Sequence, residues 1–189
     1  HKGFNPSAFR KSIITNLEKG RFARGGSTIT MQLVKNVFLN REKTISRKIE
    51  EILLVWLIEQ NQLVSKERMF EVYLNIIEWG PGIYGIKEAS EYYFKKTPSE
   101  LNLAESIFLA GVIPHPKYFH YSFNKDGSLK DFVKDYFRIA SQFMLKKQLI
   151  TEEEFSNLKP EIKLTGPAKL KVAPLDFELP IEMDDDLSE

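Results

Sequence analysis

Apolar side chains recur at helical spacing along most of the chain, whereas the strict alternation that is typical of strands is sparse. The opening segment shows the helical period at Phe4, Ala8, Phe9, Ile13 and Leu17. Further helices are predicted over residues 28–39, from about 44, over 65–77, from about 86, over 102–112 and 129–149, and briefly after Thr151. The pattern as a whole predicts an all-α fold.

A glycine-serine turn precedes the helix predicted over residues 28–39. Gly25 and Gly26 allow a tight turn, and the hydroxyls of Ser27 and Thr28 can cap the helix that follows. The free amides at such a helix start, together with the positive end of the helix dipole, favour an anion. Phosphate is the most natural ligand for this position.

The same helix is predicted to have two different faces. An apolar face, expected to pack into the core, carries Ile29, Leu33 and Val37. A polar face carries Gln32, Lys35 and Asn36. Polar groups are therefore expected to project together from one side of the helix.

The next helix, from about Thr44, places Arg47 and Lys48 one turn before Glu51, so two cations and a carboxylate can meet on one surface. Taken alone, an ordinary exposed ion pair between Arg47 and Glu51 is the plainer interpretation. The apolar run from Ile52 to Ile58 is predicted to be a buried part of this helix, because it is far shorter than the roughly 20 residues that span a bilayer.

Local signals predict where the later helices begin. Ser65 is expected to cap a helix whose apolar stripe is Met69, Val72, Tyr73, Ile76 and Ile77, and most of this segment is interpreted as structural. The segment WGPGIYG (79–85) is expected to end that helix in a turn. Two further helix starts have the spacing of capping boxes, namely Asn102 with Glu105 and Thr151 with Glu154.

Four motifs occur in a fixed order along the chain. They are GGSTITMQLVKN (25–36), RKIEE (47–51), SKERMFEVYLNIIEWGPGIYGIKEAS (65–90) and LNLAESIFLAGVIPHPKYF (101–119). In this order they resemble the peptidoglycan glycosyltransferases, the transglycosylase modules of penicillin-binding proteins and their monofunctional relatives. The resemblance covers residues 1–150 and implies an all-α, lysozyme-like fold with a large lobe and a smaller jaw. Residues 151–189 are expected to form a short helix and an acidic tail or linker.

The resemblance implies that lipid II is polymerised into β-1,4 glycan strands, with inversion at the anomeric carbon and release of polyprenyl diphosphate. Glu51 corresponds to the family's second essential glutamate, which would orient cations or a metal at the diphosphate. The implied substrate contacts are Ser27, Gln32, Lys35, Asn36, Lys43, Arg47 and Lys48. A divalent cation, Mg²⁺ or Mn²⁺, is an optional aid, and no residue is assigned as its ligand.

The family's general base is a different glutamate, in a motif of which His1, Gly3 and Phe4 match only the end. We therefore expect the base seven positions upstream of His1. The implied location is the extracytoplasmic, periplasmic face of the inner membrane, with an anchor upstream of the chain. The implied partners are lipid II, the growing glycan chain, the cytoplasmic membrane and other cell-wall synthesis proteins.

Composition narrows the function further. The 189 residues suit one domain, and the absence of cysteine excludes disulfides and thiolate metal sites. Residues 1–60 hold eleven Lys or Arg against five Asp or Glu, whereas the last twelve residues hold six acidic residues and no Lys or Arg. An anionic partner is favoured. Nucleic acid is not expected, because no helix-turn-helix, zinc-finger or RNA-binding aromatic signature is present.

Two other functions remain open at this point. A lysozyme-like glycan hydrolase would need a carboxylate pair and an activated water. A catalytically silent module that binds lipid diphosphate would need only the cationic cluster. His115 and His120 lie near Pro114 and Pro116 without a partner carboxylate at a suitable spacing, and are interpreted as loop residues.

Overall fold

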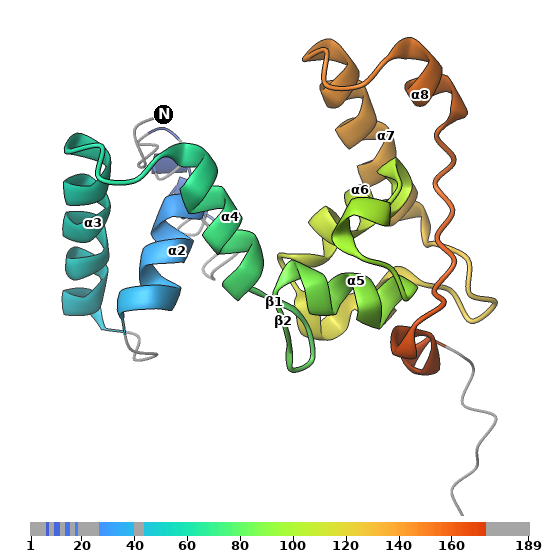
Figure 1. The fold of residues 1–189 in the computed structure, drawn as a ribbon, viewed down its shortest axis with the longest axis horizontal. Coiled ribbons are helices and arrows are strands. Elements are labelled where there is room, and N and C mark those ends of the chain that lie inside the picture. Colours follow the sequence, from blue (N-terminus) through green and yellow to red (C-terminus); the bar gives the residue numbers. More distant parts are fainter. Residues whose placement is uncertain are drawn as a thin grey trace, which may run out of the picture. The chain divides into compact units, whose positions relative to one another are not determined.

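The computed structural model describes residues 27–39 and 44–172, together with isolated positions between 7 and 18. The described chain is mostly helical, apart from one short hairpin, which confirms the predicted all-α class and is consistent with a lysozyme-like fold (Figure 1). The apolar positions of the predicted opening helix, Phe4 to Leu17, lie outside the described residues, as does Lys43.

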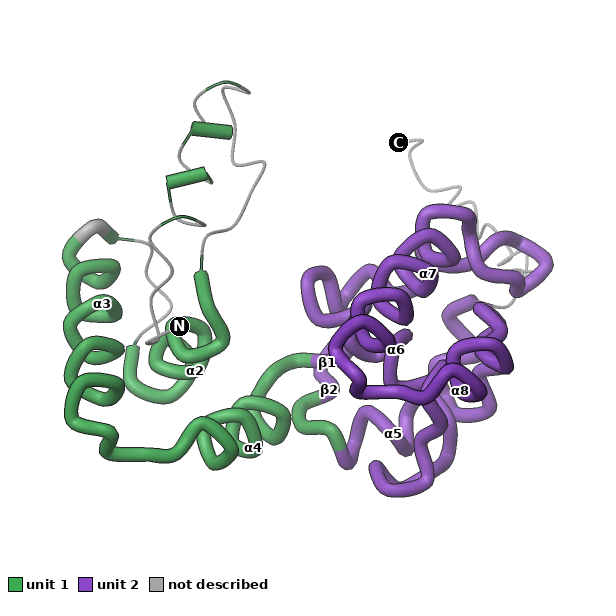
Figure 2. Tube along the Cα trace, turned by 90° about the horizontal axis from the view of Figure 1, so that it is seen from above, with its two compact units in different colours: residues 1–78, 84–86 green, residues 79–83, 87–189 purple. Residues whose placement is uncertain are grey.

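The chain divides into two compact units, residues 1–78 with 84–86 and residues 79–83 with 87–189 (Figure 2). The first unit contains α2 (Ile29–Phe38), α3 (Ile45–Gln60) and α4 (Lys66–Ile76). The chain passes between the units through a hairpin of β1 (Glu78–Gly80) and β2 (Ile83–Tyr84). The elements that follow are α5 (Ile86–Phe94), η1 (Pro98–Glu100), α6 (Leu103–Val112), η2 (Pro116–Ser122), α7 (Asp131–Lys146), α8 (Glu152–Asn157) and η3 (Pro167–Lys171).

In the first unit, α2 packs against both α3 and α4 (Figure 1). Met31 and Val34 of α2 form a buried cluster with Val55 of α3. On the same side of α2, the hydroxyl of Thr30 donates to Oε1 of Glu59 at 2.9 Å, so a polar bond between α2 and α3 accompanies the apolar contact. Burial of these apolar side chains stabilises the unit by the removal of their surface from water.

The apolar face predicted for α2 is only partly right. Leu33 is buried, but Ile29 and Val37 are 44% and 48% exposed, and the buried apolar positions beside Leu33 are Met31 and Val34. The physical reason is that α2 has apolar residues on more than one side. A period of four residues identifies a stripe but does not show which side the neighbouring helices cover.

The apolar run of α3 is not uniformly buried either. Val55 is 2% exposed, whereas Leu53, Trp56 and Leu57 are all exposed. Because successive helical residues point about 100° apart, a run of seven apolar residues faces every side of the helix. The helices packed against α3 within the described chain cover only one side of this run.

The apolar stripe of α4 is confirmed in its main positions, since Met69, Tyr73 and Ile77 are buried. The predicted turn after α4 is also confirmed. Gly85 has a φ of +83°, and a Cβ atom there would lie 2.8 Å from the carbonyl oxygen of Asn75. Only glycine fits this close approach without strain. The helix predicted from about Ile86 follows directly.

Aromatic side chains fill the core of the second unit. The ring of Tyr93 meets those of Phe119 and Phe108 edge to face, with centroids 5.0 and 5.8 Å apart. Its hydroxyl donates to the carbonyl oxygen of Trp79 at 2.7 Å. Burial, followed by the neighbouring Tyr92, raises the pKa of Tyr93 well above its ordinary value. This tyrosine is thus a neutral, fully paired core residue.

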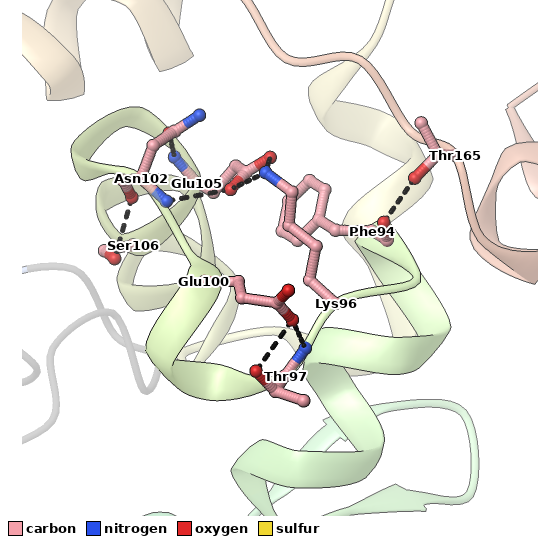
Figure 3. Close-up of polar contacts among 8 residues, drawn as sticks. All are labelled: Phe94, Lys96, Thr97, Glu100, Asn102, Glu105, Ser106 and Thr165. Atoms are coloured by element: carbon pink, nitrogen blue, oxygen red, sulfur yellow. Dashed lines mark hydrogen bonds and ion pairs between the residues drawn. The ribbon is translucent and has the colours of Figure 1, made fainter.

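Helix starts in the second unit rest on local hydrogen bonds (Figure 3). Asn102 and Glu105 form the predicted capping box, and Nζ of Lys96 adds an ion pair with both Glu105 oxygens at 2.7 and 2.9 Å. Thr151 and Glu154 form the other predicted box, at the start of α8. Each box satisfies amides that the helix itself leaves without partners.

The chain beyond α8 forms no regular element over residues 158–165, but it packs against the second unit. Leu164 and Ala168 are buried, and the N–H groups of Thr165 and Gly166 both donate to the carbonyl oxygen of Tyr93 at 3.1 Å. The hydroxyl of Thr165 also donates to the carbonyl oxygen of Phe94 (Figure 3). Residues up to Val172 are therefore part of the second unit rather than a free tail.

Candidate active site

The centre of the candidate site is a buried carboxylate at the first turns of α3. Glu51 is 1% exposed, and its Oε1 lies 2.6 Å from Nζ of Lys48. The same Nζ donates to Oγ of Ser27 at 3.4 Å. Ser27 immediately precedes Thr28, whose hydroxyl caps α2 by accepting from the N–H of Met31 at 3.2 Å. A cation and the amino end of a helix therefore lie beside each other.

Arg47 adds a second cation on the other side of Glu51. Its NH1 lies 3.9 Å from Oε2 of Glu51, and its side chain is only 15% exposed. The hydroxyl of Thr44 caps α3 by accepting from the N–H of Arg47 at 3.2 Å, which fixes the start of this helix. Nε of Arg47 is buried without a hydrogen-bond partner in the described structure. Such a donor is costly unless a ligand or water meets it.

The polar face of α2 is arranged as the spacing predicts, and it also receives a hydrogen bond from Tyr73 of α4. Gln32 is half-buried, and its Oε1 accepts from the hydroxyl of Tyr73 at 3.1 Å. Lys35 and Asn36 are exposed one turn further along α2. Residues three and four apart on a helix share a face, so Lys35 and Asn36 lie on the side of Gln32.

The structure thus joins Ser27, Arg47, Lys48 and Glu51 through contacts, and places Gln32, Lys35 and Asn36 on one face of α2. The interpretation of Arg47 and Glu51 as an exposed ion pair is wrong, because Glu51 is buried. The spacing along α4 predicts Tyr73 only as a core residue. Its hydroxyl in an otherwise aliphatic stripe is the signal that could have identified a polar partner.

The cluster of Glu51, Lys48 and Arg47 fits an anion better than a metal ion. Both oxygens of Glu51 face cations, so neither is free of positive neighbours. Across the described ranges, no group of three or more His, Asp or Glu side chains could hold a metal ion. Mg²⁺ usually needs carboxylates and phosphate oxygens around it. The arrangement can stabilise negative charge on a ligand that enters beside Lys48 and Arg47.

His115 and His120 lie in the second unit. His115 precedes η2 and His120 lies within it. His115 helps to line an apolar cavity of about 340 Å³ together with Tyr118, Tyr121 and Phe132. The residues that line this cavity include no carboxylate.

A family model described as transglycosylase matches residues 1–140 of the chain, a range that includes every predicted site residue. The chain belongs to the transglycosylase family. The turn of α3 that carries Arg47 and Lys48, and the capped start of α2, therefore lie within a transglycosylase domain. Within the part of the chain described, no helix combines the length and apolar character needed to cross a membrane.

This transglycosylase chain is similar to curated proteins named biosynthetic peptidoglycan transglycosylase. It is 47% identical to the protein of Paraburkholderia xenovorans over 119 residues, which are 63% of this chain and 49% of the relative. It is 42% identical to the protein of Methylobacillus flagellatus over 119 residues, which are 63% of this chain and 51% of the relative. It is 41% identical to the protein of Chromobacterium violaceum over 127 residues, which are 67% of this chain and 55% of the relative. The chain spans about half the length of these relatives.

Proposed function

We propose that this transglycosylase polymerises lipid II into β-1,4-linked glycan strands and releases polyprenyl diphosphate, with inversion at the anomeric carbon. One observation carries the proposal. Glu51 is buried between Lys48 and Arg47, and Lys48 also donates to Ser27, which precedes the capped start of α2. This arrangement supports binding of a diphosphate, and family membership supports the sugar chemistry.

The reaction places a specific demand on the site. The acceptor 4-hydroxyl attacks the anomeric carbon and gives its proton to a base, while the bond from that carbon to the phosphate oxygen breaks. The electrons of the broken bond stay on the leaving diphosphate. Lys48, Arg47 and the amides at the start of α2 would stabilise that growing negative charge. The base itself is predicted to be the glutamate upstream of His1.

Glu51 acts on this site through its neighbours. An ionised carboxylate only accepts hydrogen bonds, and the two oxygens of Glu51 face Lys48 and Arg47 from a buried position. The carboxylate therefore holds the two cations in place. Their combined charge exceeds that of Glu51, which leaves the site attractive to an anion. Lys35 and Asn36 would add contacts to sugar or phosphate from the exposed face of α2.

The two alternatives differ in what they require of Glu51. A glycan hydrolase needs one carboxyl group that gives a proton and a second carboxylate near it. Glu51 is surrounded by cations instead, which argues against this role. A silent binding module would keep the affinity for lipid diphosphate but make no glycan, so an assay of polymer formation separates it from the proposed enzyme.

Location and partners are part of the same proposal. Lipid-linked substrate and a growing glycan chain would place the protein at the periplasmic face of the inner membrane, together with other cell-wall synthesis proteins. A divalent cation, Mg²⁺ or Mn²⁺, would take most of its ligands from diphosphate oxygens. No residue of the described chain is assigned as its ligand, because both oxygens of Glu51 face cations.

The test measures affinity for a lipid-linked disaccharide diphosphate, and glycan polymer formation on gels, in the full-length protein. Lys48→Ala is expected to weaken binding about tenfold or more, because a charge-assisted contact is lost. Lys134→Ala is the matched control, since Lys134 also forms an ion pair with a carboxylate three residues away, on α7. Unchanged affinity in Lys48→Ala would overturn the proposal, as would equal losses in both variants.

A further inference from the structure

A buried hydroxyl of α4 reaches the polar face of α2. Tyr73 is 2% exposed, and its hydroxyl lies 3.1 Å from Oε1 of Gln32, a residue 41 positions earlier in the chain. Both residues belong to the first unit, in which α2 packs against α4. This bond links a core residue to a residue of the proposed substrate site.

The bond restricts the whole side-chain amide of Gln32. The amide group is planar, so fixing its oxygen also fixes the direction of its nitrogen. A glutamine side chain left to rotate would lose conformational entropy when it bound a ligand, a cost of up to about 2 kcal/mol for this residue type. A partner that holds the side chain before binding removes part of that cost.

The direction of the bond follows from the two atoms that meet, because an amide oxygen can only accept. The hydroxyl of Tyr73 is protonated at neutral pH, and burial raises its pKa further above the ordinary value, so it keeps the proton that it donates. The carbonyl oxygen of Gln32 is the acceptor. The NH₂ group of Gln32 is then the part of the amide that can donate to an oxygen of a ligand.

We infer that Tyr73 is a positioning residue of the proposed site: it holds Gln32 so that the amide NH₂ donates to an acceptor oxygen of the lipid-linked substrate. The inference rests on the proposed function. The acceptor oxygen belongs either to the diphosphate or to the first sugar. Both are hydrogen-bond acceptors, and two probes distinguish them.

The experiment is a double-mutant cycle on the full-length protein, with affinity measured for a lipid-linked disaccharide diphosphate. Tyr73→Phe removes only the hydroxyl and is expected to weaken binding about 3- to 10-fold, the range of one hydrogen bond. Gln32→Ala is expected to weaken binding at least as much. Because Tyr73 acts through Gln32, adding Tyr73→Phe to Gln32→Ala should cause no further loss.

Tyr93→Phe is the matched control, because it deletes another buried tyrosine hydroxyl that donates to a carbonyl oxygen, in the second unit. It is expected to reduce thermal stability without weakening binding. Gln32→Glu keeps an acceptor for Tyr73 but replaces the donor NH₂ by oxygen. This variant should fold normally and bind at least tenfold more weakly.

A second probe, polyprenyl diphosphate without sugar, shows whether the oxygen that accepts from Gln32 belongs to the diphosphate or to the sugar. A loss in Tyr73→Phe with both probes supports the inference with the diphosphate as acceptor, and a loss only with the disaccharide probe supports it with the sugar. If the unmodified protein binds the probe and Tyr73→Phe binds it equally well, the inference is wrong but the proposed function stands. The same holds if the losses in affinity of the two single variants add up fully in the double variant. Absence of binding by the unmodified protein overturns the proposed function and this inference with it.

Discussion

Nζ of Lys48 lies 2.6 Å from Oε1 of Glu51, one helical turn away on α3. The lysine side chain is about one-third exposed at 34%, whereas the glutamate side chain is 2% exposed. The pair therefore has one end in the protein interior and one end towards solvent. A cation held in this way can meet an incoming anion without first losing its whole hydration shell.

The first prediction concerns the charge of Glu51. Glu51→Gln keeps the shape of the side chain but leaves Lys48 and Arg47 without their carboxylate. We expect the free energy of unfolding to fall by about 1–3 kcal/mol, since breaking a buried ion pair is costly and both cations keep some solvent contact. Glycan polymerisation should fall about a hundredfold or more, because the cations lose their orientation. Thermal unfolding and a polymerisation assay measure the two effects.

Glu71→Gln provides the comparison for that variant. Glu71 forms an ion pair with Arg68 at 2.8 Å, three residues earlier on α4, and both side chains are mostly exposed. Exposed pairs contribute only about 0–1 kcal/mol. A melting temperature that drops as far in Glu71→Gln as in Glu51→Gln would contradict the role of burial. Full polymerisation by Glu51→Gln would contradict its role in the site.

The second prediction concerns the buried Nε of Arg47. A lysine at this position would keep the charge but could not supply that donor or the planar fork of the guanidinium. Arg47→Lys is therefore expected to weaken binding of lipid-linked disaccharide diphosphate about tenfold, with little change in melting temperature. Arg68→Lys, on the exposed face of α4, should bind normally. Equal affinities in the two variants would show that Nε meets no ligand.

Helix starts could be predicted from the sequence because their physics is local. Thr28 and Ser65 cap α2 and α4 by accepting from an N–H three residues on, and Asn102 with Glu105 forms the expected box. The cationic turn was predictable for the same reason, since Arg47 and Glu51 lie one turn apart on a single helix.

Burial and contacts between helices could not be predicted in the same way. Ile29 and Val37 are as apolar as Val34, yet they are exposed because α3 and α4 cover another side of α2. The bond from Tyr73 to Gln32 joins residues 41 positions apart, and no periodicity within one helix specifies it. Burial of Glu51 depends in the same way on how the helices pack.

The third prediction concerns the titration of Glu100. The N–H of Thr97 and then its hydroxyl donate to Oε2 of Glu100, each at 2.7 Å, and lower the pKa of this carboxyl below its ordinary value of about 4.5. The bonds favour the ionised form, so their stabilising effect is present above that value and is lost as the pH falls through the lower, folded-state pKa. Thr97→Ala keeps the N–H and should move the NMR titration midpoint only part of the way back. Thr151→Ala, in the separate box of α8, should leave it unchanged.

The last prediction concerns the attachment of the chain beyond α8 to the second unit. At Gly166 a Cβ atom would lie 2.2 Å from the carbonyl oxygen of Tyr92 and 2.6 Å from that of Glu91, and both obstacles are backbone atoms that a side-chain rotation cannot move. Gly166→Ala should therefore push residues 164–168 away from α5, break the bonds to Tyr93 and expose Leu164 and Ala168.

We expect Gly166→Ala to lower the free energy of unfolding by about 2–4 kcal/mol, as other changes that disrupt a buried contact do, and to speed amide exchange at residues 164–168. Gly127→Ala is the contrasting variant: its Cβ would meet no atom within 4 Å, and only its φ of +82° opposes the change, at about 1 kcal/mol. The two substitutions are chemically identical. A larger loss of free energy of unfolding in Gly166→Ala therefore measures how closely the backbone at Gly166 approaches the backbone of α5. Equal losses would mean that residues 164–168 contribute little to the second unit.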